Sequence, residues 1–326
     1  MTSEITMRNY RPDDLPALVA LINEADAVDK LERATTLEEM EYEMSFPTDS
    51  PETNCFLAWE GDRLVGWTNM YVARGNPKVD TETAIWCWGV VHPHWRRRGL
   101  GRRLLETAYA RASELLPEIE VPRVNFGSST RDVEEDRKAL YEGFGMRPVR
   151  YTANLARPIN GDLPPLVVPD GYRLRTFDPE RDINAVWRVD NVAFRDHWGH
   201  SEAELEDYEH CIEFPHFQAE LWYLAEEQAS GEVVGLGLNT IDPDWIARTG
   251  RQEGYVATLA VLREHRQQGL GTVLLVQGLH ALRQAGMEGA HLHADSENLT
   301  GAMRLYERVG FRVRKTYVAY HRVMRA

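Results

Sequence analysis

The sequence carries one strand–turn–helix pattern twice, and the two copies lie 170 residues apart. The copies run over residues 89–101 and 259–271, and in each an apolar run precedes the spacing Arg-x-x-Gly-x-Gly. The matching residues are Arg96, Gly99 and Gly101 in the first copy, and Arg266, Gly269 and Gly271 in the second. A long unit used twice predicts a duplicated domain, because the repeats of a solenoid are much shorter.

Each turn opens a helix whose first turn is expected to bind an anion. The first backbone N–H groups of a helix have no partner within the helix, and the helix dipole favours negative charge there. Paired glycines let the backbone approach a ligand closely, and the arginine adds a fixed cation. Arg266, Gly269 and Gly271 therefore predict a cradle for a phosphate or a diphosphate.

Other phosphate-binding patterns fit this segment less well. The dinucleotide fingerprint needs a third glycine where the chain has Leu274. A Walker loop needs Gly-Lys-Ser/Thr, but here Gly271 is followed directly by Thr272. A turn that binds no ligand remains the alternative for either copy alone, because short glycine motifs recur by chance.

A third block follows the second copy and makes the pattern more specific. It has the spacing Asn298…Leu-Tyr306-x-x-x-Gly310-Phe311, after a strand expected at residues 290–294. With the earlier Arg-x-x-Gly-x-Gly turn, this block resembles the GNAT (GCN5-related N-acetyltransferase) superfamily. The duplication resembles the tandem members of that superfamily. The resemblance covers nearly the whole chain and is stronger in the second half.

The resemblance implies an acetyltransferase that uses acetyl-coenzyme A and transfers its acetyl group directly to the primary amine of a small molecule. The strand before the turn would pair with the pantetheine arm, and the turn would hold the diphosphate. The expected coenzyme-binding residues are Leu259, Ala260, Val261, Arg266, Gln267, Gln268, Gly269, Leu270, Gly271, Thr272 and Asn298 in the second half, and Val90, Val91, Arg96, Arg97, Arg98, Gly99 and Gly101 in the first.

The catalytic residues that the resemblance implies are Tyr306 and Glu253. A phenol has a pKa near 10 and a thiol near 8.5, so Tyr306 can donate a proton to the departing thiolate. Glu253 has the same strand parity as Tyr255 and would accept the proton of the amine; a surface glutamate or a chain of waters is the alternative. Expected substrate contacts, with loop packing as the alternative, are Asp196, His197 and Trp198.

The first half keeps the glycine turn and Tyr141 but changes other positions of the pattern. Counted from the helix tyrosines, Val133 takes the place of Asn298 and Met146 that of Phe311; counted from the glycine turns, Thr83 takes the place of Glu253. We therefore expect the first half to hold coenzyme A or an analogue without efficient catalysis, or to act only structurally. Cys87 matches Ala257 in the comparison counted from the glycine turns, so no shared thiol chemistry is indicated.

The order of strand and helix patterns predicts the α/β class (α+β mixed sheet), with two tandem GNAT-like domains. Each is expected to be a mixed, largely antiparallel sheet flanked by helices. The expected boundaries are 1–157 for the first domain, 158–171 for a linker rich in Pro and Gly, and 172–326 for the second domain. Strands at Val149–Leu155 and Phe311–His321 are expected to close the first and second domain respectively.

The composition argues against several other classes of function. A formal net charge of −14 opposes nucleic-acid binding, which needs clustered cations. The chain shows no membrane-spanning apolar run and no secretion signal, so a cytoplasmic location is expected. Three widely spaced cysteines argue against a disulfide framework, and the His92/His94 and His291/His293 pairs are expected to be structural rather than metal ligands.

Two alternatives to a general amine acetyltransferase stay open. One keeps the reaction and narrows the acceptor to the cysteinyl amine of a mycothiol precursor. The other is a coenzyme A-binding sensor or interaction module with little turnover, which the degenerate first half favours and the intact Asn298/Tyr306 block opposes.

Overall fold

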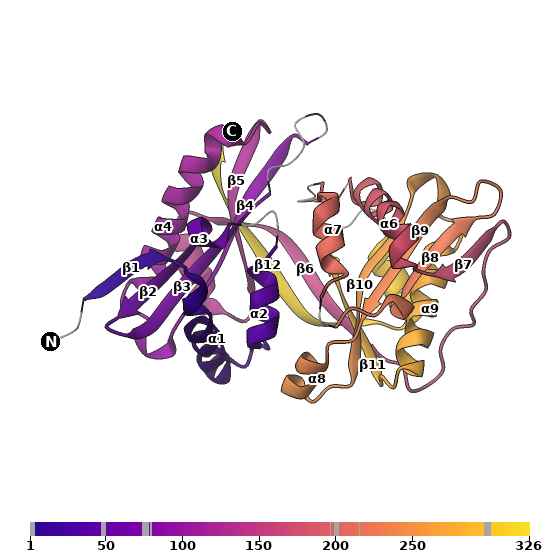
Figure 1. The fold of residues 1–326 in the computed structure, drawn as a ribbon, viewed down its shortest axis with the longest axis horizontal. Coiled ribbons are helices and arrows are strands. Elements are labelled where there is room, and N and C mark those ends of the chain that lie inside the picture. The colour runs from indigo at the N-terminus through magenta and orange to yellow at the C-terminus, as the bar shows by residue number, and fades with distance from the viewer. Residues whose placement is uncertain are drawn as a thin grey trace. The chain divides into compact units, whose positions relative to one another are not determined.

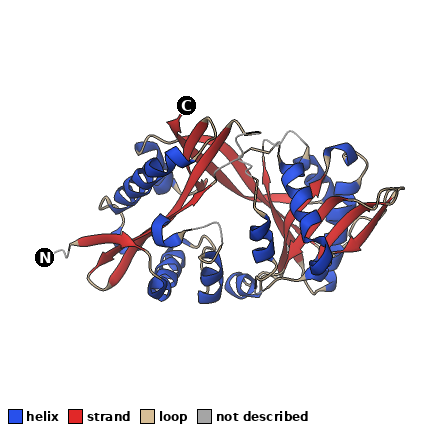
Figure 2. Cartoon of the chain, turned by 45° about the horizontal axis from the view of Figure 1, so that its top comes forward, coloured by secondary structure: helices blue, strands red, loops and turns tan. Residues whose placement is uncertain are grey.

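The computed structural model describes residues 4–46, 50–73, 78, 80–195, 197–198, 202–214, 216–296 and 301–326. The chain forms two compact units, one of Met1–Val149 with Val318–Ala326 and one of Arg150–Tyr317 (Figure 1). In each unit helices lie against a mixed sheet, which confirms the expected fold class (Figure 2).

The first unit contains a sheet with the strand order β1-β2-β3-β4-β5-β12. Pairing is antiparallel from β1 through β4 and parallel between β4 and β5. The strands are β1 (Ile5–Asn9), β2 (Cys55–Glu60), β3 (Arg63–Val72), β4 (Glu82–Val91), β5 (Arg123–Arg131) and the end of β12 (Arg312–Arg325). The helices are η1 (Pro12–Asp14), α1 (Leu15–Asp29), α2 (Leu37–Glu43), α3 (Pro51–Asn54), η2 (Pro93–Trp95), α4 (Leu100–Leu115), η3 (Leu116–Glu118) and α5 (Glu135–Gly143).

The second unit repeats this plan, with the strand order β6-β11-β10-β9-β8-β7. Here β10 and β11 are the parallel pair. The strands are β6 (Arg147–Pro158), β7 (Tyr172–Thr176), β8 (Trp222–Glu227), β9 (Val233–Thr240), β10 (Glu253–Val261) and β11 (Gly289–Asp295). The helices are α6 (Pro179–Phe194), α7 (Leu205–Cys211), η4 (Ala219–Leu221), α8 (Pro243–Thr249), η5 (Arg263–His265), α9 (Leu270–Gln284) and α10 (Ala302–Val309).

The crossover helices α4 and α9 each join the two parallel strands of their unit. Both have an apolar stripe at helical spacing, and that stripe is buried. In the first unit Leu105 and Ala108 pack with Phe126 of β5. In the second, Leu279 packs with Leu292 of β11. This packing fixes the start of each helix at the end of the strand before it, which is where the glycine turns lie.

The compact units do not coincide with the boundaries expected from the sequence. Residues Thr152–Pro158 of β6 pair with β11 and so belong to the second unit, as does the whole stretch 158–171. Val318 and Tyr320 of β12 lie instead in the core of the first unit. The two strands expected to close their own halves are therefore exchanged. An alternating pattern identifies a strand, but it does not identify the partner with which the strand pairs.

A β-bulge in β10 distinguishes the second half from the first. The register between β9 and β10 shifts between Val256 and Thr258, so Ala257 is an extra residue, whereas the pairing of β3 with β4 shows no shift. The comparison counted from the glycine turns is consequently wrong by one residue before this point. Val256 rather than Ala257 is the counterpart of Cys87, and Ala84 rather than Thr83 is the counterpart of Glu253.

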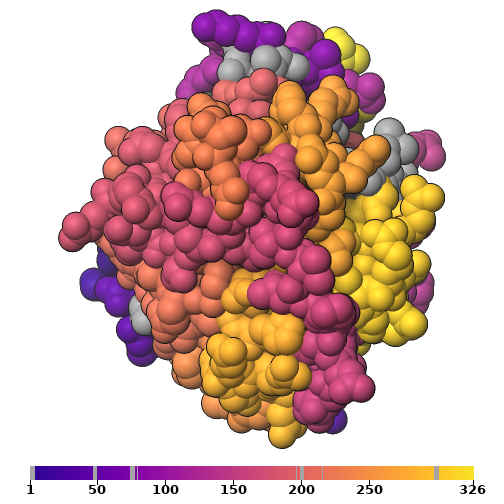
Figure 3. Space-filling view, turned by 90° about the vertical axis from the view of Figure 1, so that its right-hand side faces the viewer, coloured from indigo at the N-terminus to yellow at the C-terminus, as the bar shows by residue number. Residues whose placement is uncertain are grey.

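The expected linker runs along the surface of the second unit (Figure 3). Arg283 of α9 donates to the Gly161 carbonyl at 3.1 Å, and His280 lies 3.4 Å from the Pro164 carbonyl oxygen. Within the described ranges, none of the helices combines the length and apolar character needed to cross a membrane.

Candidate functional site

The two glycine turns have the same backbone conformation. Gly99 and Gly269 have φ of 83° and 90°, and the residues two positions earlier, Arg97 and Gln267, also have positive φ, at 61° and 63°. A non-glycine residue rarely adopts this conformation, so its presence at both turns marks a constrained structure. When residues with positive and negative φ alternate, successive backbone N–H groups point to the same side and form a concave site that can bind an anion.

The helix starts beyond these turns have free backbone donors. The first helical hydrogen bonds run from Arg103 N–H to the Gly99 carbonyl and from Val273 N–H to the Gly269 carbonyl, both at 3.1 Å. Among the described residues, no side chain caps the start of α4 at Gly99 or the start of α9 at Gly269. The N–H groups of the first helical turn in α4 and α9 therefore face a place where an anion can bind.

The motif arginines hold the turns to neighbouring parts of the chain. Arg96 Nε donates to the Val91 carbonyl at 3.0 Å, and its other nitrogens lie 2.6 and 2.7 Å from the Asp29 carboxylate. Arg266 Nε donates to the Val261 carbonyl at 2.9 Å, and its Nη2 donates to the Ala193 carbonyl at 2.8 Å. These bonds hold each turn to its neighbouring elements, and binding of the coenzyme by Arg96 and Arg266 stays a prediction.

The glycines of each pair have different surroundings. A Cβ on Gly101 would lie 3.2 Å from Leu140 of α5, and one on Gly271 would lie 3.2 Å from Leu305 of α10. Because these two glycines have no side chain, the helix that carries the tyrosine can pack closely against the start of α4 or α9. A Cβ on Gly99 would meet no atom within 4 Å, and one on Gly269 would meet only Pro169, at 3.6 Å. The first glycine of each turn is thus open on its outer side.

The parallel strands separate several residues before the turns begin. Pairing of β4 with β5 ends at Trp86 and Gly127, and pairing of β10 with β11 ends at Val256 and Leu292. The expected coenzyme-binding strand residues lie beyond these points, on the diverging edges: Val90, Val91, Leu259, Ala260 and Val261. Such an edge offers backbone donors and acceptors to an extended ligand that pairs as an added strand.

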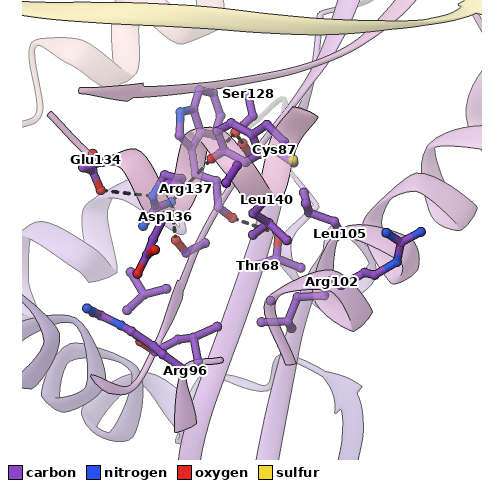
Figure 4. A pocket seen from close by; sticks show the side chains of 18 of the residues that line it. Thr68, Cys87, Arg96, Arg102, Leu105, Ser128, Glu134, Asp136, Arg137 and Leu140 are labelled. Carbon is purple, nitrogen blue, oxygen red and sulfur yellow. Dashed lines mark hydrogen bonds and ion pairs between the residues drawn. The ribbon is translucent and has the colours of Figure 1, made fainter. Parts of the chain in front are cut away.

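In the first unit this arrangement encloses a cavity of about 810 Å³ (Figure 4). It extends from the glycine turn along β4 to the hydroxyl end of Tyr141. Its lining includes the expected residues Val90, Val91, Arg96, Arg97, Gly99 and Gly101. Arg98 is exposed on the turn. A cavity of this size is in the range of small-molecule sites.

A partly buried guanidinium contacts the strand edge in this cavity. Arg137 Nη1 donates to the Gly89 carbonyl at 3.0 Å, and Arg137 Nε donates to Glu134 at 3.1 Å (Figure 4). Burial alone would lower the pKa of Arg137, but Tyr141 and Glu134 raise it above its ordinary value, so the charge persists. The counterpart of Arg137, four residues before the helix tyrosine in the second half, is Ala302. The sequence contained this difference, but its consequence depends on the contact with Gly89.

The two helix tyrosines also differ in their surroundings. The Tyr141 hydroxyl lies 2.7 Å from the Ser128 hydroxyl. Tyr306 is buried in an apolar cluster that includes Leu292, the counterpart of Ser128, and Phe311. Burial, with Tyr255 adding to it, raises the pKa of Tyr306 to about 12. Tyr306 is therefore a neutral phenol at physiological pH and can donate a proton.

The other expected site residues of the second unit take these positions. Glu253 Oε2 accepts a hydrogen bond from Arg314 at 2.6 Å. His197 packs against Phe194 with ring centroids 4.6 Å apart, and the Arg150 guanidinium lies 5.8 Å from the centre of the Trp198 ring. Gln267 and Gln268 are exposed on the turn, with Leu270, Gly271 and Thr272 in the first turn of α9. Asn298 and Asp196 lie outside the described residues.

The histidine pairs have specific partners. His92 Nε2 lies 2.8 Å from Glu24, and its Nδ1 accepts from His94 N–H at 3.2 Å. His291 stacks on Tyr255 with ring centroids 4.9 Å apart. Elsewhere in the second unit, potential ligand atoms of His216, Asp242 and Asp244 lie within 4.8 Å of one another, a grouping that the sequence analysis missed. Asp242 already caps α8 through Trp245 N–H at 2.7 Å.

Comparison with known proteins agrees with the geometry of the turns. The Acetyltransferase (GNAT) family model matches residues 20–146 and 183–311, one match in each half. The mycothiol acetyltransferase of Thermobispora bispora is 32% identical over 329 residues, covering 99% of this chain and all of that protein. The mycothiol acetyltransferase of Thermomonospora curvata is 36% identical over 223 residues, 68% of each chain.

Solved structures show the same fold over the whole chain. A GCN5-related N-acetyltransferase from Sphaerobacter thermophilus superposes with a TM-score of 0.75 at 24% identity, covering 99% of this chain and 96% of that one. A tandem GNAT protein from the clavulanic acid biosynthesis pathway superposes with a TM-score of 0.68 at 18% identity, covering 98% of each chain. The resemblance found in the sequence and the tandem arrangement are thereby confirmed.

Proposed function

Because this chain belongs to the GNAT family of acetyltransferases, we propose that its second unit transfers an acetyl group from acetyl-coenzyme A to the primary amine of a small molecule. The observation that carries this proposal is the pair of matching turns, each with an open glycine, uncapped helix donors and a diverging strand edge. Mycothiol acetyltransferases align with the whole chain, which supports an acceptor of the cysteinyl-amine type.

The residues of the second unit fit the coenzyme at three points. The backbone N–H groups from Gln267 to Thr272 would hold the diphosphate at the start of α9. The edge Leu259–Val261 would pair with the amides of the pantetheine arm. Bound acetyl-coenzyme A would supply the acetyl group as a thioester, and Tyr306 would protonate the departing sulfur. Orientation of both reactants in one site would supply much of the rate.

The first unit is assigned coenzyme binding without efficient turnover. Its cavity and turn support binding of the diphosphate. Arg137, however, already bonds the Gly89 carbonyl, the strand-edge acceptor that a pantetheine amide would use, and the second unit has Ala302 at that position. This division assigns the repeat of residues 1–157 to coenzyme holding and that of 172–326 to catalysis. His197 and Trp198, together with Asp196 and Asn298, stay predicted contacts of the second repeat.

A coenzyme-binding sensor is the second candidate function. The contact of Arg137 with the Gly89 carbonyl, in a cavity of about 810 Å³, favours such a role for the first unit alone. For the whole chain, the sensor predicts coenzyme binding in both units and no thiol release with any amine. The acetyltransferase predicts thiol release from acetyl-coenzyme A with at least one amine among cysteine amide, glucosamine and spermidine.

The test uses one glycine of each turn. Gly99→Val and Gly269→Val place a branched side chain over the helix donors and should weaken coenzyme A binding in their own unit roughly tenfold or more, through loss of hydrogen bonds each worth about 1 kcal/mol. Calorimetry should show two sites in the wild type, and in each variant one site of unchanged affinity and one weakened site. Gly269→Val should also raise the KM for acetyl-coenzyme A in thiol release, whereas Gly99→Val should leave it unchanged.

The matched controls carry the same backbone strain away from the turns. Gly145 has φ of 83°, and Gly286 has φ of 89°, and a Cβ on either would meet no atom within 4 Å. Gly145→Val and Gly286→Val should therefore keep both sites. Two unchanged sites in Gly269→Val, with the control folded, would remove the proposed diphosphate cradle.

A further inference from the structure

In the second unit, one face of the sheet carries a cluster of polar and aromatic side chains. Val256 of β10 and Leu292 of β11 pack in the core with α9. Side chains alternate along a strand, so the neighbours of these residues lie on the opposite face. That face carries Glu253, Tyr255, His291 and His293, joined by Arg314 and Tyr317 of β12.

His293 stands at the point where the two parallel strands separate. The last registered pair is Val256 with Leu292, and His293 is the next residue of β11. The residue has exposed surface, although its ring packs against those of Tyr255 and Tyr317. Tyr306 lies near the same point, since it belongs to the core cluster that contains Val256 and Leu292, the last registered pair. The acyl donor proposed above would place its reacting carbon beside this opening.

The partner of His293 orients its ring. His293 Nδ1 lies 3.4 Å from the Tyr255 hydroxyl, and the rings of Tyr255 and Tyr317 lie edge-on to it at 5.8 and 5.6 Å. If Nδ1 carries the proton and donates to the Tyr255 oxygen, the lone pair of Nε2 is free to accept a proton. Burial raises the pKa of Tyr255, so its oxygen stays a neutral phenol.

Burial and nearby positive charges keep the His293 ring neutral. Burial, then the positive charges of Arg314 and Lys315 on β12, lower the pKa of His293 below its ordinary value. His291 on the same strand, Tyr255 on β10, Tyr317 on β12 and Asn154, which pairs with His293 in register on β6, complete its surroundings. A neutral imidazole at physiological pH is a proton acceptor.

The two neighbouring candidates are less well placed. Glu253 pairs with Gly289, three residues before the last pair, so it lies about 10 Å back along the strand at roughly 3.3 Å per residue. Its Oε2 is bonded to Arg314. His291 is stacked between Trp245 and Tyr255, with both ring centroids 4.9 Å away, and burial lowers its pKa to about 3.

We propose that His293 accepts the proton of the attacking amine, and that Tyr255 positions its ring; this rests on the acetyltransferase function proposed above. The neutral amine nitrogen forms the bond to the thioester carbon as its proton passes to His293 Nε2. The carbon–sulfur bond breaks, and the sulfur takes a proton from Tyr306. His293, being exposed, then releases its proton to water, and Tyr306 regains one.

The test compares the pH dependence of kcat in His293→Gln with that of the wild type, using acetyl-coenzyme A and the amine of the panel with the highest turnover. The profile of kcat reports groups in the bound complex. The wild type should lose activity below the lowered pKa of His293. His293→Gln should lower kcat about 10²-fold and lose this acidic limb, with the KM for acetyl-coenzyme A unchanged. Tyr255→Phe should lower kcat less and shift the limb.

Two controls and one spectrum separate the outcomes. His291→Gln and Glu253→Gln should keep the acidic limb; loss of the limb in Glu253→Gln with its retention in His293→Gln would overturn the proposal. Nitrogen-15 spectra of the wild type should show His293 protonated on Nδ1, and an Nε2–H tautomer would also overturn it. A wild type that releases no thiol with any amine would remove the proposed function itself, and the inference with it.

Discussion

Tyr141 and Tyr306 occupy the same position in the two repeats but have different neighbours. Tyr141 has the Ser128 hydroxyl at 2.7 Å and the Arg137 guanidinium at 3.5 Å. Tyr306 has the apolar counterparts Leu292 and Ala302 near it. A phenol held beside a fixed cation and a hydroxyl is committed to those partners, whereas a phenol in an apolar wall is available to a ligand. The assignment of catalysis to the second unit follows from this difference.

Replacement of Tyr306 by phenylalanine should separate turnover from binding. Loss of a positioned acid typically costs about 10²-fold or more in rate, while the ring still packs on Phe311. Steady-state kinetics should therefore show a fall in kcat with little change in the KM for acetyl-coenzyme A. Tyr141→Phe, the same change in the other repeat, should lower kcat far less. A rise in KM at constant kcat in Tyr306→Phe would contradict the acid role.

Motif spacing predicted the backbone of the site better than its side-chain partners. The glycine turns and the tyrosine helix follow from local spacing, since a helix start and its dipole need only adjacent residues. The partners of Arg96 and Arg266 come from Asp29 and Ala193, far away in the chain. No local pattern contains such a contact, which is why the sequence did not predict these partners.

At the scale of elements, an ion pair with a buried aspartate ties the first strand of each repeat to its first helix. Arg8 of β1 contacts both carboxylate oxygens of Asp14, at 2.6 and 2.7 Å. Arg175 of β7 contacts Asp182 in the first turn of α6, at 2.5 and 3.0 Å. Both aspartates also accept a backbone N–H, from Arg11 and Asp178 respectively. The pairs set the angle at which the chain enters the helix.

Asp182→Asn should destabilise the second unit in a pH-dependent way. Burial favours the protonated carboxyl, but bonds from Arg175 and Arg181 outweigh it and lower the pKa of Asp182. A depressed folded-state pKa gives stability that is present above the unfolded value, near 3.9, and lost as the pH falls below it. Breaking a buried pair costs about 3 kcal/mol, so thermal melts at pH 7 should show a clear drop.

The control for this change lies in the same helical turn. Glu180 is exposed, and Glu180→Gln should leave the melting temperature nearly unchanged. The difference between Asp182→Asn and the wild type should shrink as the pH falls below about 4, where the wild-type pair begins to be lost. A difference that stays constant from pH 7 to pH 3 would mean that packing, rather than the charge, accounts for the effect.

The element types of both repeats were predictable, whereas one register was not. Apolar periodicity and turn residues give strands and helices in the right order. The bulge at Ala257 leaves no sign in a single sequence, because a residue added to a strand keeps the strand composition. It nevertheless changes which side chains face α9, and with it the counterpart of Glu253 and of Cys87.

At the scale of the whole molecule, sequence repeats and packing units divide the chain differently. Val318 and Tyr320 are buried in the core of the first unit, although they end the second repeat. Arg325 donates to the carbonyls of Pro122 and Leu116 at 3.1 Å. The β12 tail therefore completes a sheet whose other strands were made near the start of the chain. Neither repeat alone contains all the strands of its unit.

Removal of residues Val318–Ala326 should thus unfold the first unit and spare the second. Two buried side chains contribute about 2 kcal/mol each, and the lost strand pairing adds to this, against a domain stability of about 5–15 kcal/mol. Hydrogen exchange should show lost protection in β4, β5 and α4, with protection kept in β10 and α9. Removal of Ala326 alone is the control. Equal protection of both units in the shortened chain would contradict the exchange of strands, because the first unit would then be complete without β12.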